Sequence, residues 1–500
     1  MNNLAQRKKQ LNLSNYFKET DYIEIDLSAD HYEGAFLFSA IGDALGWPTE
    51  FLGSINKSKL PFKLPLKEYI QWKKNVGGRW WGYYDEIKPG EYSDDTQLTL
   101  AISRCISNSG DFEPDRFAYS ELPLWLQYQR GGGRSVKTAA RTILRRKSEW
   151  CNNFYSFKER DYRNAGANGA AMRNLPIILA NVNDEHRMIT DSFYNSIITH
   201  GHPRAILGTI LFSYAVRYAL SSEDNMEKGM IEYLLNSLKT SLVISEKDPT
   251  IQTWIRKWNA ASKLNDSFTS LFQETIGEIY TYLCQIPYYL DKPENEYYSL
   301  IGALNPSTKG SGVATVCCAI YLFLKNGASP EEALFSAINI LGSDTDTIAV
   351  FLGSLLGARY GRGAIPSHFI TQLQDHEYIE KTALRLHSIS QDTFNESISQ
   401  SEQISKKEGY LRILAWEIGL QEMFWDAIGV GGIVAHPALG RGTIIHKEIK
   451  QIRRKDYEAK LLQVKFDCGQ TCIFHSRVQQ NGYISESLGK DVMRQLNGFK

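Results

Sequence analysis

Apolar residues recur at helical spacing through most of the first 390 positions. Segments such as residues 31–46, 202–220 and 331–342 place apolar side chains three and four positions apart, which is the period of a helix. Many of these segments are apolar on more than one side and rich in alanine and glycine, as in buried helices. Gly353 and Gly357, four positions apart, would let a neighbouring backbone approach closely. The pattern predicts a compact, mainly α-helical bundle.

The pattern changes twice toward the C-terminus. Residues 387–409 are rich in serine, glutamine and charged residues, which is typical of a linker or a solvated helix. A helical pattern follows at 411–428, and from Gly431 short β-branched runs broken by glycine and proline predict a small antiparallel β-barrel. We therefore expect an N-terminal extension (1–29), a helical domain (30–390), a linker with a connecting helix (391–430) and a small β domain (431–500).

Charge and composition exclude several classes of protein. The chain has 56 basic and 56 acidic residues, so no overall field favours nucleic acid or membrane. Residues 431–500 hold 12 Lys plus Arg against 6 Asp plus Glu. The N-terminus has no apolar signal core, and the apolar run at 348–358 is shorter than the roughly 20 residues of a membrane helix. We expect a soluble, cytoplasmic protein without a membrane partner.

Two acidic motifs stand before apolar helical runs. One is "SDD" at residues 93–95, and the other is "SDTDT" at residues 343–347. One aspartate at each site is explained by capping of free backbone N–H groups at a helix start. Paired carboxylates repel unless a cation lies between them, and neighbouring hydroxyls extend an oxygen ligand set. From these residues alone, helix capping and a shared Mg²⁺ or Mn²⁺ site both remain open.

Five segments, taken in order, resemble the ADP-ribosylglycohydrolase superfamily over residues 30 to about 390. They are "GAFLFSAIGDALGWPTEF" (34–51), "YSDDTQLTLAI" (92–102), "GANGAAMRNLPI" (166–177), "THGHPRAILG" (199–208) and "LGSDTDTIAVFLGSLLGARYG" (341–361). The resemblance implies an all-α fold with two Mg²⁺ or Mn²⁺ ions. As ligands it implies Ser93, Asp94, Asp95, Asp344, Asp346 and Thr347. One departure is Ser343, where the family often has a second glycine before the motif.

The resemblance also implies the chemistry and its residues. Hydrolysis at the anomeric ribose carbon would use Glu50 for proton handling, with Asp94 and Asp95 acting in catalysis as well as in metal binding. A solvated loop glutamate is the alternative for Glu50, and Asp43 is expected to cap or anchor. The expected substrate-binding residues are Gly166, Asn168, Gly169, His200, Gly310, Ser311 and Gly312. Arg173 is either a buried structural residue or a ligand contact, and "RGGGRS" (130–135) is either a phosphate loop or a plain turn.

The expected function is a metal-dependent hydrolase that removes ADP-ribose from a modified macromolecule, either a protein or a nucleic acid. The alternative is a non-catalytic protein that binds ADP-ribose or a toxin and acts by occlusion. The segment from Val434 to Phe466 resembles small SH3-like or Tudor-like barrels. Its positive excess predicts contact with nucleic acid or an acidic protein, or else a solvated basic hairpin.

Overall fold

The structure is a computed structural model whose described part excludes most of the expected N-terminal extension and much of the expected linker. The described residues are 25, 28–50, 52, 60, 62–77, 82–146, 148–157, 160–221, 226–261, 266–394, 405–420, 428–455 and 457–479.

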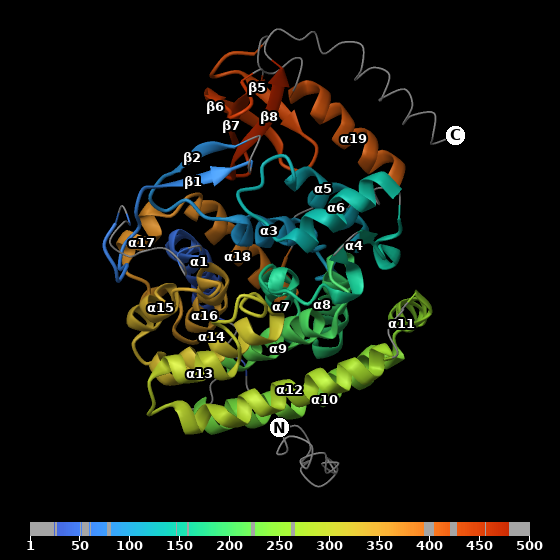
Figure 1. Cartoon of the computed structure of the whole chain (residues 1–500), viewed down its shortest axis with the longest axis vertical. Coiled ribbons are helices and arrows are strands. Elements are labelled where there is room, and N and C mark those ends of the chain that lie inside the picture. Colours follow the sequence, from blue (N-terminus) through green and yellow to red (C-terminus); the bar gives the residue numbers. More distant parts are fainter. Residues whose placement is uncertain are drawn as a thin grey trace.

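Helices form most of the described chain, which confirms the mainly α class (Figure 1). The segments expected at 31–46 and 202–220 lie in α1 and α9, and the one expected at 331–342 gives the shorter α15. The helices are α1 (Ala29–Gly46), α3 (Asp94–Arg104), α4 (Pro114–Arg116), α5 (Leu122–Trp125), α6 (Arg134–Arg146), α7 (Leu175–Ala180), α8 (Glu185–Thr199), α9 (Pro203–Ala219), α10 (Met226–Lys247), α11 (Pro249–Ala261), α12 (Phe268–Tyr289), α13 (Glu294–Leu300), α14 (Gly312–Asn326), α15 (Pro330–Ile338), α16 (Thr345–Tyr360), α17 (Ser367–Gln372), α18 (His376–Ser390) and α19 (Lys406–Ile418).

Helices α1 and α16 pack against each other through glycines. A Cβ added at Gly353 would stand 2.3 Å from the Phe38 carbonyl oxygen, and one at Gly357 would stand 2.0 Å from the Gly34 oxygen. On α1, a Cβ at Gly42 would stand 2.3 Å from the Ala349 oxygen. The close approach expected from Gly353 and Gly357 is therefore confirmed, and it sets the end of α1 beside the start of α16.

The C-terminal strands form an open sheet. Strands β5 (Ile433–His436), β6 (Gly440–Gln451), β7 (Tyr457–Phe466) and β8 (Thr471–Gln479) pair in that order, all antiparallel. Within the described chain no pairing joins β5 to β8, so the expected closed barrel is wrong. The physical reason is that one face of the sheet is covered by α19 and by the segment after α5: Phe474 packs against Trp416 and Tyr128. A sheet covered in this way does not need to close on itself.

Two hairpins complete the strand content. Strands β1 (Trp72–Val76) and β2 (Tyr83–Ile87) form one, and β3 (Ser156–Phe157) and β4 (Arg160–Asp161) form the other. The β1–β2 hairpin lies next to the C-terminal sheet in Figure 1, and Tyr83 packs with Ile452, Ala459 and Leu461.

Polar bonds fasten the sheet to the helical body. Asp375, just before α18, accepts hydrogen bonds from Tyr92 Oη (2.9 Å) and from the Thr471 N–H (2.7 Å) and Oγ1 (2.8 Å), and it pairs with Lys465 (2.9 Å). Arg104 at the end of α3 donates to Gln470 Oε1 (2.7 Å) and pairs with Glu121 (2.8 Å). The sheet is thus anchored at the end of the helix whose start carries the first acidic motif.

None of the helices described by the structure is long and apolar enough to cross a membrane.

Candidate metal centre and active site

The starts of α3 and α16 bring acidic side chains together beside the turn after α1. Carboxylate oxygens of Glu50, Asp344 and Asp346 all lie within 4.8 Å of one another. Thr347 Oγ1 donates a 2.8 Å hydrogen bond to Asp95 Oδ2, which joins the two motifs directly. The two helix starts, about 250 residues apart in sequence, therefore meet as the metal-site hypothesis requires.

Local hydrogen bonds hold the first motif in place. Ser93 Oγ accepts from the Asp95 N–H (3.2 Å), so this side chain caps α3. Asp43 on α1 accepts from the Ser93 N–H (3.1 Å), the Thr96 N–H (2.9 Å) and Thr96 Oγ1 (2.6 Å). The anchoring role expected for Asp43 is confirmed, and it leaves Asp94 and Asp95 free of the capping duty that could have explained them.

The acidic cluster is electrostatically strained. Burial, followed by the charge of Asp344, raises the pKa of Glu50 to about 8, and Lys74 and Lys309 oppose the shift. Burial also raises the pKa values of Asp95 and Asp346 well above the ordinary range, and neighbouring carboxylates add to both shifts. A buried group of like charges is stabilised by a cation placed among them.

The donor set fits a hard divalent cation. Carboxylate oxygens are the ligands that Mg²⁺ and Mn²⁺ prefer, and three of them lie close enough here to share an ion. Asp344 is also held from the side, because Asn168 Nδ2 donates to its Oδ2 at 2.8 Å. The cluster can therefore bind a metal ion, and Asn168 orients one of the carboxylates.

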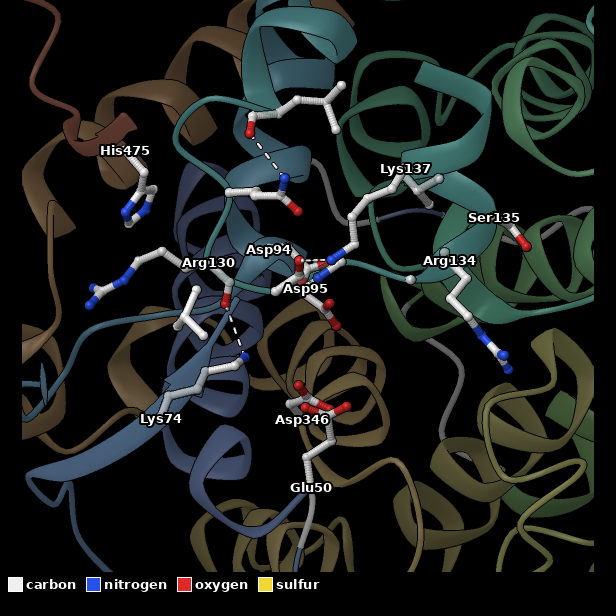
Figure 2. Close-up of a pocket in the computed structure, with 18 of the residues that line it drawn as sticks. Glu50, Lys74, Asp94, Asp95, Arg130, Arg134, Ser135, Lys137, Asp346 and His475 are labelled. Carbon is white, nitrogen blue, oxygen red and sulfur yellow. Dashed lines mark hydrogen bonds between the residues drawn. The ribbon is translucent and has the colours of Figure 1, made fainter. Parts of the chain in front are cut away.

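A cavity of about 1210 Å³ opens above this cluster. In Figure 2 the carboxylates of Glu50, Asp94, Asp95 and Asp346 lie in the middle, with Arg134 and Ser135 on one side and His475 on the opposite side. The cationic side chains that line the cavity are Lys74, Arg130, Arg134, Lys137, Arg141 and Lys309. A ligand with negative charges facing these cationic side chains, and with hydroxyls facing the acidic cluster, would be complementary to this lining.

Some of the expected substrate-binding residues line this cavity. Asn168, Gly169 and His200 do, and His200 is 1% exposed with its Nδ1 2.7 Å from Thr199 Oγ1. Burial lowers the pKa of His200 to about 3, so a neutral imidazole faces the cavity at physiological pH.

Others lie behind it, outside the lining: Gly166, Gly310, Ser311 and Gly312. The Gly312 N–H donates to the Gly166 oxygen (3.0 Å), and a Cβ at Gly312 would stand 2.6 Å from the Arg204 oxygen of α9. The Gly310 oxygen accepts from the Asn168 N–H (2.9 Å). In the structure these four residues pack and position the 166–169 segment.

Arg173 is structural. It is fully buried, and its guanidinium donates to Asn195 Oδ1 (2.7 Å), the Gly169 oxygen (2.7 Å) and Thr199 Oγ1 (2.9 Å). It therefore supports the backbone of the 166–169 segment from beneath.

The loop at 130–135 is more than a plain turn, because its glycines contact Asp94 of the acidic cluster. The Gly132 N–H donates to Asp94 Oδ1 at 2.6 Å, and a Cβ at Gly131 would stand 2.0 Å from the same oxygen. The three consecutive glycines were the signal for this approach. Lys74 on β1 and Lys309, whose Nζ donates to the Glu50 and Ser343 carbonyl oxygens at 3.4 Å, had no distinguishing signal in sequence.

The chain belongs to the ADP-ribosylglycohydrolase family, whose model matches residues 25–396. The ADP-ribosyl-dinitrogen reductase glycohydrolase of Rhodospirillum rubrum is 31% identical over 174 residues, which is 35% of this chain and 52% of that protein. ADP-ribosylhydrolase ARH3 of Danio rerio is 24% identical over 72% of this chain and 90% of its own length. ADP-ribosylarginine hydrolase Tri1 of Serratia proteamaculans is 22% identical over 72% of this chain and 79% of its own. The resemblance seen in the sequence is thereby confirmed.

Proposed function

We propose that this chain is a metal-dependent hydrolase that releases ADP-ribose from a modified protein. The observation that carries the proposal is the meeting of Glu50, Asp344 and Asp346 within 4.8 Å at the floor of a large cavity. The family relationship supports the type of bond that is cut. Pure binding would not need a strained acidic cluster, because neutral donors bind ribose and phosphate at lower cost.

We propose two Mg²⁺ or Mn²⁺ ions as cofactors, held by Ser93, Asp94, Asp95, Asp344, Asp346 and Thr347 at the cluster that Glu50 completes. Bound there, divalent ions supply positive charge that orients ribose hydroxyls and lowers the pKa of water. The hydrogen bond from Thr347 to Asp95 and that from Asn168 to Asp344 keep the ligand oxygens in place.

The protein's own groups then handle the proton and the developing charge. Water adds to the anomeric carbon, the bond from that carbon to the acceptor atom breaks, and one proton passes from the water to the acceptor. Glu50 lies in the acidic cluster, so its carboxylate can take that proton from the water and pass it to the acceptor atom. The surrounding carboxylates offset the positive charge of an oxocarbenium-like transition state.

The residues that line the cavity support one orientation of the bound substrate. Arg134, Lys137 and Arg141 belong to α6, on the side of the cavity that suits a diphosphate. Asn168, Gly169 and His200 would then lie along the ribose between the diphosphate and the acidic floor.

The test is release of ADP-ribose from ADP-ribosylated proteins by full-length protein, with and without Mg²⁺ or Mn²⁺. We expect metal-dependent release, and loss of both metal binding and release in an Asp344→Ala, Asp346→Ala double variant. Equal metal binding by wild type and double variant in calorimetry would contradict the metal site. Tight ADP-ribose binding without release from any modified protein would favour the occlusion alternative.

A further inference from the structure

The cavity has a second wall, built by a part of the chain that the family match does not include. Residues beyond 396 lie outside that match, yet α19, the residues just after it and the C-terminal sheet contribute to the lining. Their contributions are Glu417, Leu420, Ala459, His475 and Ser476.

This wall enlarges the site beyond the needs of one nucleotide-sized ligand. The cavity volume is about 1210 Å³, whereas pockets for small ligands usually measure roughly 300–1,000 Å³. His475 lies on the opposite side of the carboxylates from Arg134 and Ser135 (Figure 2). If the diphosphate of the bound substrate lies along α6, the protein group attached to the ribose points toward the C-terminal wall.

The wall is held in a defined position. The backbone N–H of His475 in β8 donates to the backbone carbonyl oxygen of Gln127 (3.1 Å), and Tyr83 Oη lies 2.7 Å from His475 Nδ1. Gln127 Nε2 in turn donates to Glu417 Oε1 (3.2 Å). Three separate segments, the one after α5, α19 and β8, are thus tied together where they face the cavity.

Two oxygen atoms of this wall could accept hydrogen bonds from a ligand. Gln127 Oε1 and Ser476 Oγ are buried, and neither has a hydrogen-bond partner among the described residues. Both residues line the cavity, so a side-chain rotation would let a ligand donor reach either oxygen; for Gln127 the rotation gives up its bond to Glu417, which then also faces the ligand.

Glu417 adds a negative charge to these oxygens. It is an exposed residue that lines the cavity, and it has no ion pair among the described residues. Arg130 also lines the cavity, but it is paired with Asp85 (3.4 Å) and Glu91 (2.8 Å). Glu417 contacts Gln127 and shares the cavity lining with Ser476, and a carboxylate among acceptor oxygens favours a donor-rich cation, such as a lysine or arginine side chain.

We propose that Gln127, Glu417 and Ser476 form an acceptor subsite, which binds a basic side chain of the modified protein next to its ADP-ribosylated residue. The inference rests on the proposed function for the direction of the substrate. It makes the C-terminal region a specificity element of the active-site cavity rather than a remote docking module.

The test compares two synthetic peptides ADP-ribosylated at one arginine, with lysines on both sides of it in one and glutamines in the other. Binding to full-length protein is measured by fluorescence anisotropy without added metal, so that the peptide stays intact, and hydrolysis is measured separately with Mg²⁺. We expect the lysine peptide to bind about fivefold more tightly at low salt, a modest ion-pair effect that salt reduces. Glu417→Gln should abolish this preference, and Glu417→Lys should reverse it, while the glutamine peptide binds either variant about as tightly as it binds wild type.

The matched control is Glu408→Gln on the same helix, because Glu408 pairs with Arg412 and does not line the cavity. It should leave the preference unchanged. A wild-type protein without preference, or a preference that survives Glu417→Gln, would overturn the subsite. Preferential binding without any hydrolysis would instead count against the proposed hydrolase and leave the subsite standing.

Discussion

At the residue scale, the site combines carboxylates that repel one another with neighbours that keep them from moving apart. Asp346 is 4% exposed and Asp95 is 3% exposed, and each has other carboxylates among the causes of its raised pKa. Asp43, Gly132 and Asn168 hold this cluster through hydrogen bonds to backbone or side chain. The repulsion between these carboxylates lowers the stability of the folded protein, and it is relieved when a cation or a proton binds among them.

Glu50→Gln tests the proton-handling role. The substitution keeps the size of the side chain and removes its ability to carry a proton between water and the acceptor. We expect kcat to fall by about 100-fold or more, the range for a general acid or base, while the Kd for ADP-ribose changes little. Steady-state kinetics and calorimetry measure the two quantities. An unchanged kcat would move the role elsewhere, and a large loss of metal affinity would make Glu50 a metal ligand first.

Asp191, remote from the metal centre, gives a test of pH dependence. Burial raises its pKa to about 7, Asp111 and Asp184 add to the shift, and the Phe112 N–H and Arg187 oppose it. Because the folded pKa exceeds the unfolded value near 4, Asp191 contributes stability below about pH 4 that is lost as pH rises through 7. Asn in its place can still accept from Phe112, but it does not titrate.

The expected result is a free energy of unfolding that falls less steeply between pH 4 and pH 7 in Asp191→Asn than in wild type. Urea unfolding at several pH values measures both curves. Parallel curves would show that this carboxyl titrates normally in the folded protein.

At the element scale, the sequence predicted the helices well, and its glycines predicted one close helix contact without saying which helices would meet. The helices α1 and α9 are buried on nearly every side, as their apolar sequences indicated. Gly353 and Gly357 indicated a close approach by another backbone, which in the structure is that of α1. The two acidic motifs were recognisable because each begins a helix. Lys74 and Lys309 were missed because they reach the site through tertiary packing of a strand and a loop, which no local pattern encodes. Gly166 and Gly312 pack closely with neighbouring backbone, which no local pattern indicated, and the substrate contacts expected of Gly166, Gly310, Ser311 and Gly312 stay a prediction.

The crossing of α1 and α16 predicts contrasting effects for two glycine-to-alanine substitutions. Gly353→Ala would place a Cβ 2.3 Å from the Phe38 oxygen, whereas Gly277 in α12 has nothing within 4 Å. We expect Gly353→Ala to destabilise by about 1–3 kcal/mol through overpacking, and to weaken metal binding because Asp346 moves with α16. Gly277→Ala should stabilise by about 0.5–1 kcal/mol, since alanine is the better helix residue. Thermal unfolding and metal titration of both variants check this contrast, and equal effects would contradict the tight crossing.

At the scale of the whole molecule, the C-terminal sheet is continuous with the helical body. Tyr128 makes edge contacts with His436 and Phe474, and Trp416 of α19 packs on both. The composition of residues 387–409 predicted a linker, and strand periodicity predicted a β domain. Neither signal says what covers a sheet, because the covering residues, such as Tyr128, lie some 300 positions earlier in the chain. The domain boundaries stay a proposal, and so does nucleic-acid or acidic-protein contact through the basic strands.

Truncation after Ser390 tests how far the C-terminal region can be separated. A free module would leave a protein with full stability and normal hydrolysis of a small ADP-ribosylated substrate. We expect the opposite, because the truncation exposes the fully buried Tyr128 and removes the partners that Thr471, Lys465 and Gln470 give to Asp375 and Arg104. The loss is on the order of 5 kcal/mol from apolar exposure and broken buried hydrogen bonds. It should lower soluble yield, the midpoint of thermal unfolding and turnover together, since Arg104 ends the helix that begins at Asp94. A matched chain ending at residue 479 keeps all of these contacts. It should therefore keep the soluble yield, the midpoint of thermal unfolding and the turnover of the full-length protein. If the protein ending at Ser390 is as stable and as active on the small substrate as that control, the sheet is a separable module and its place in the active-site cavity is dispensable for the chemistry.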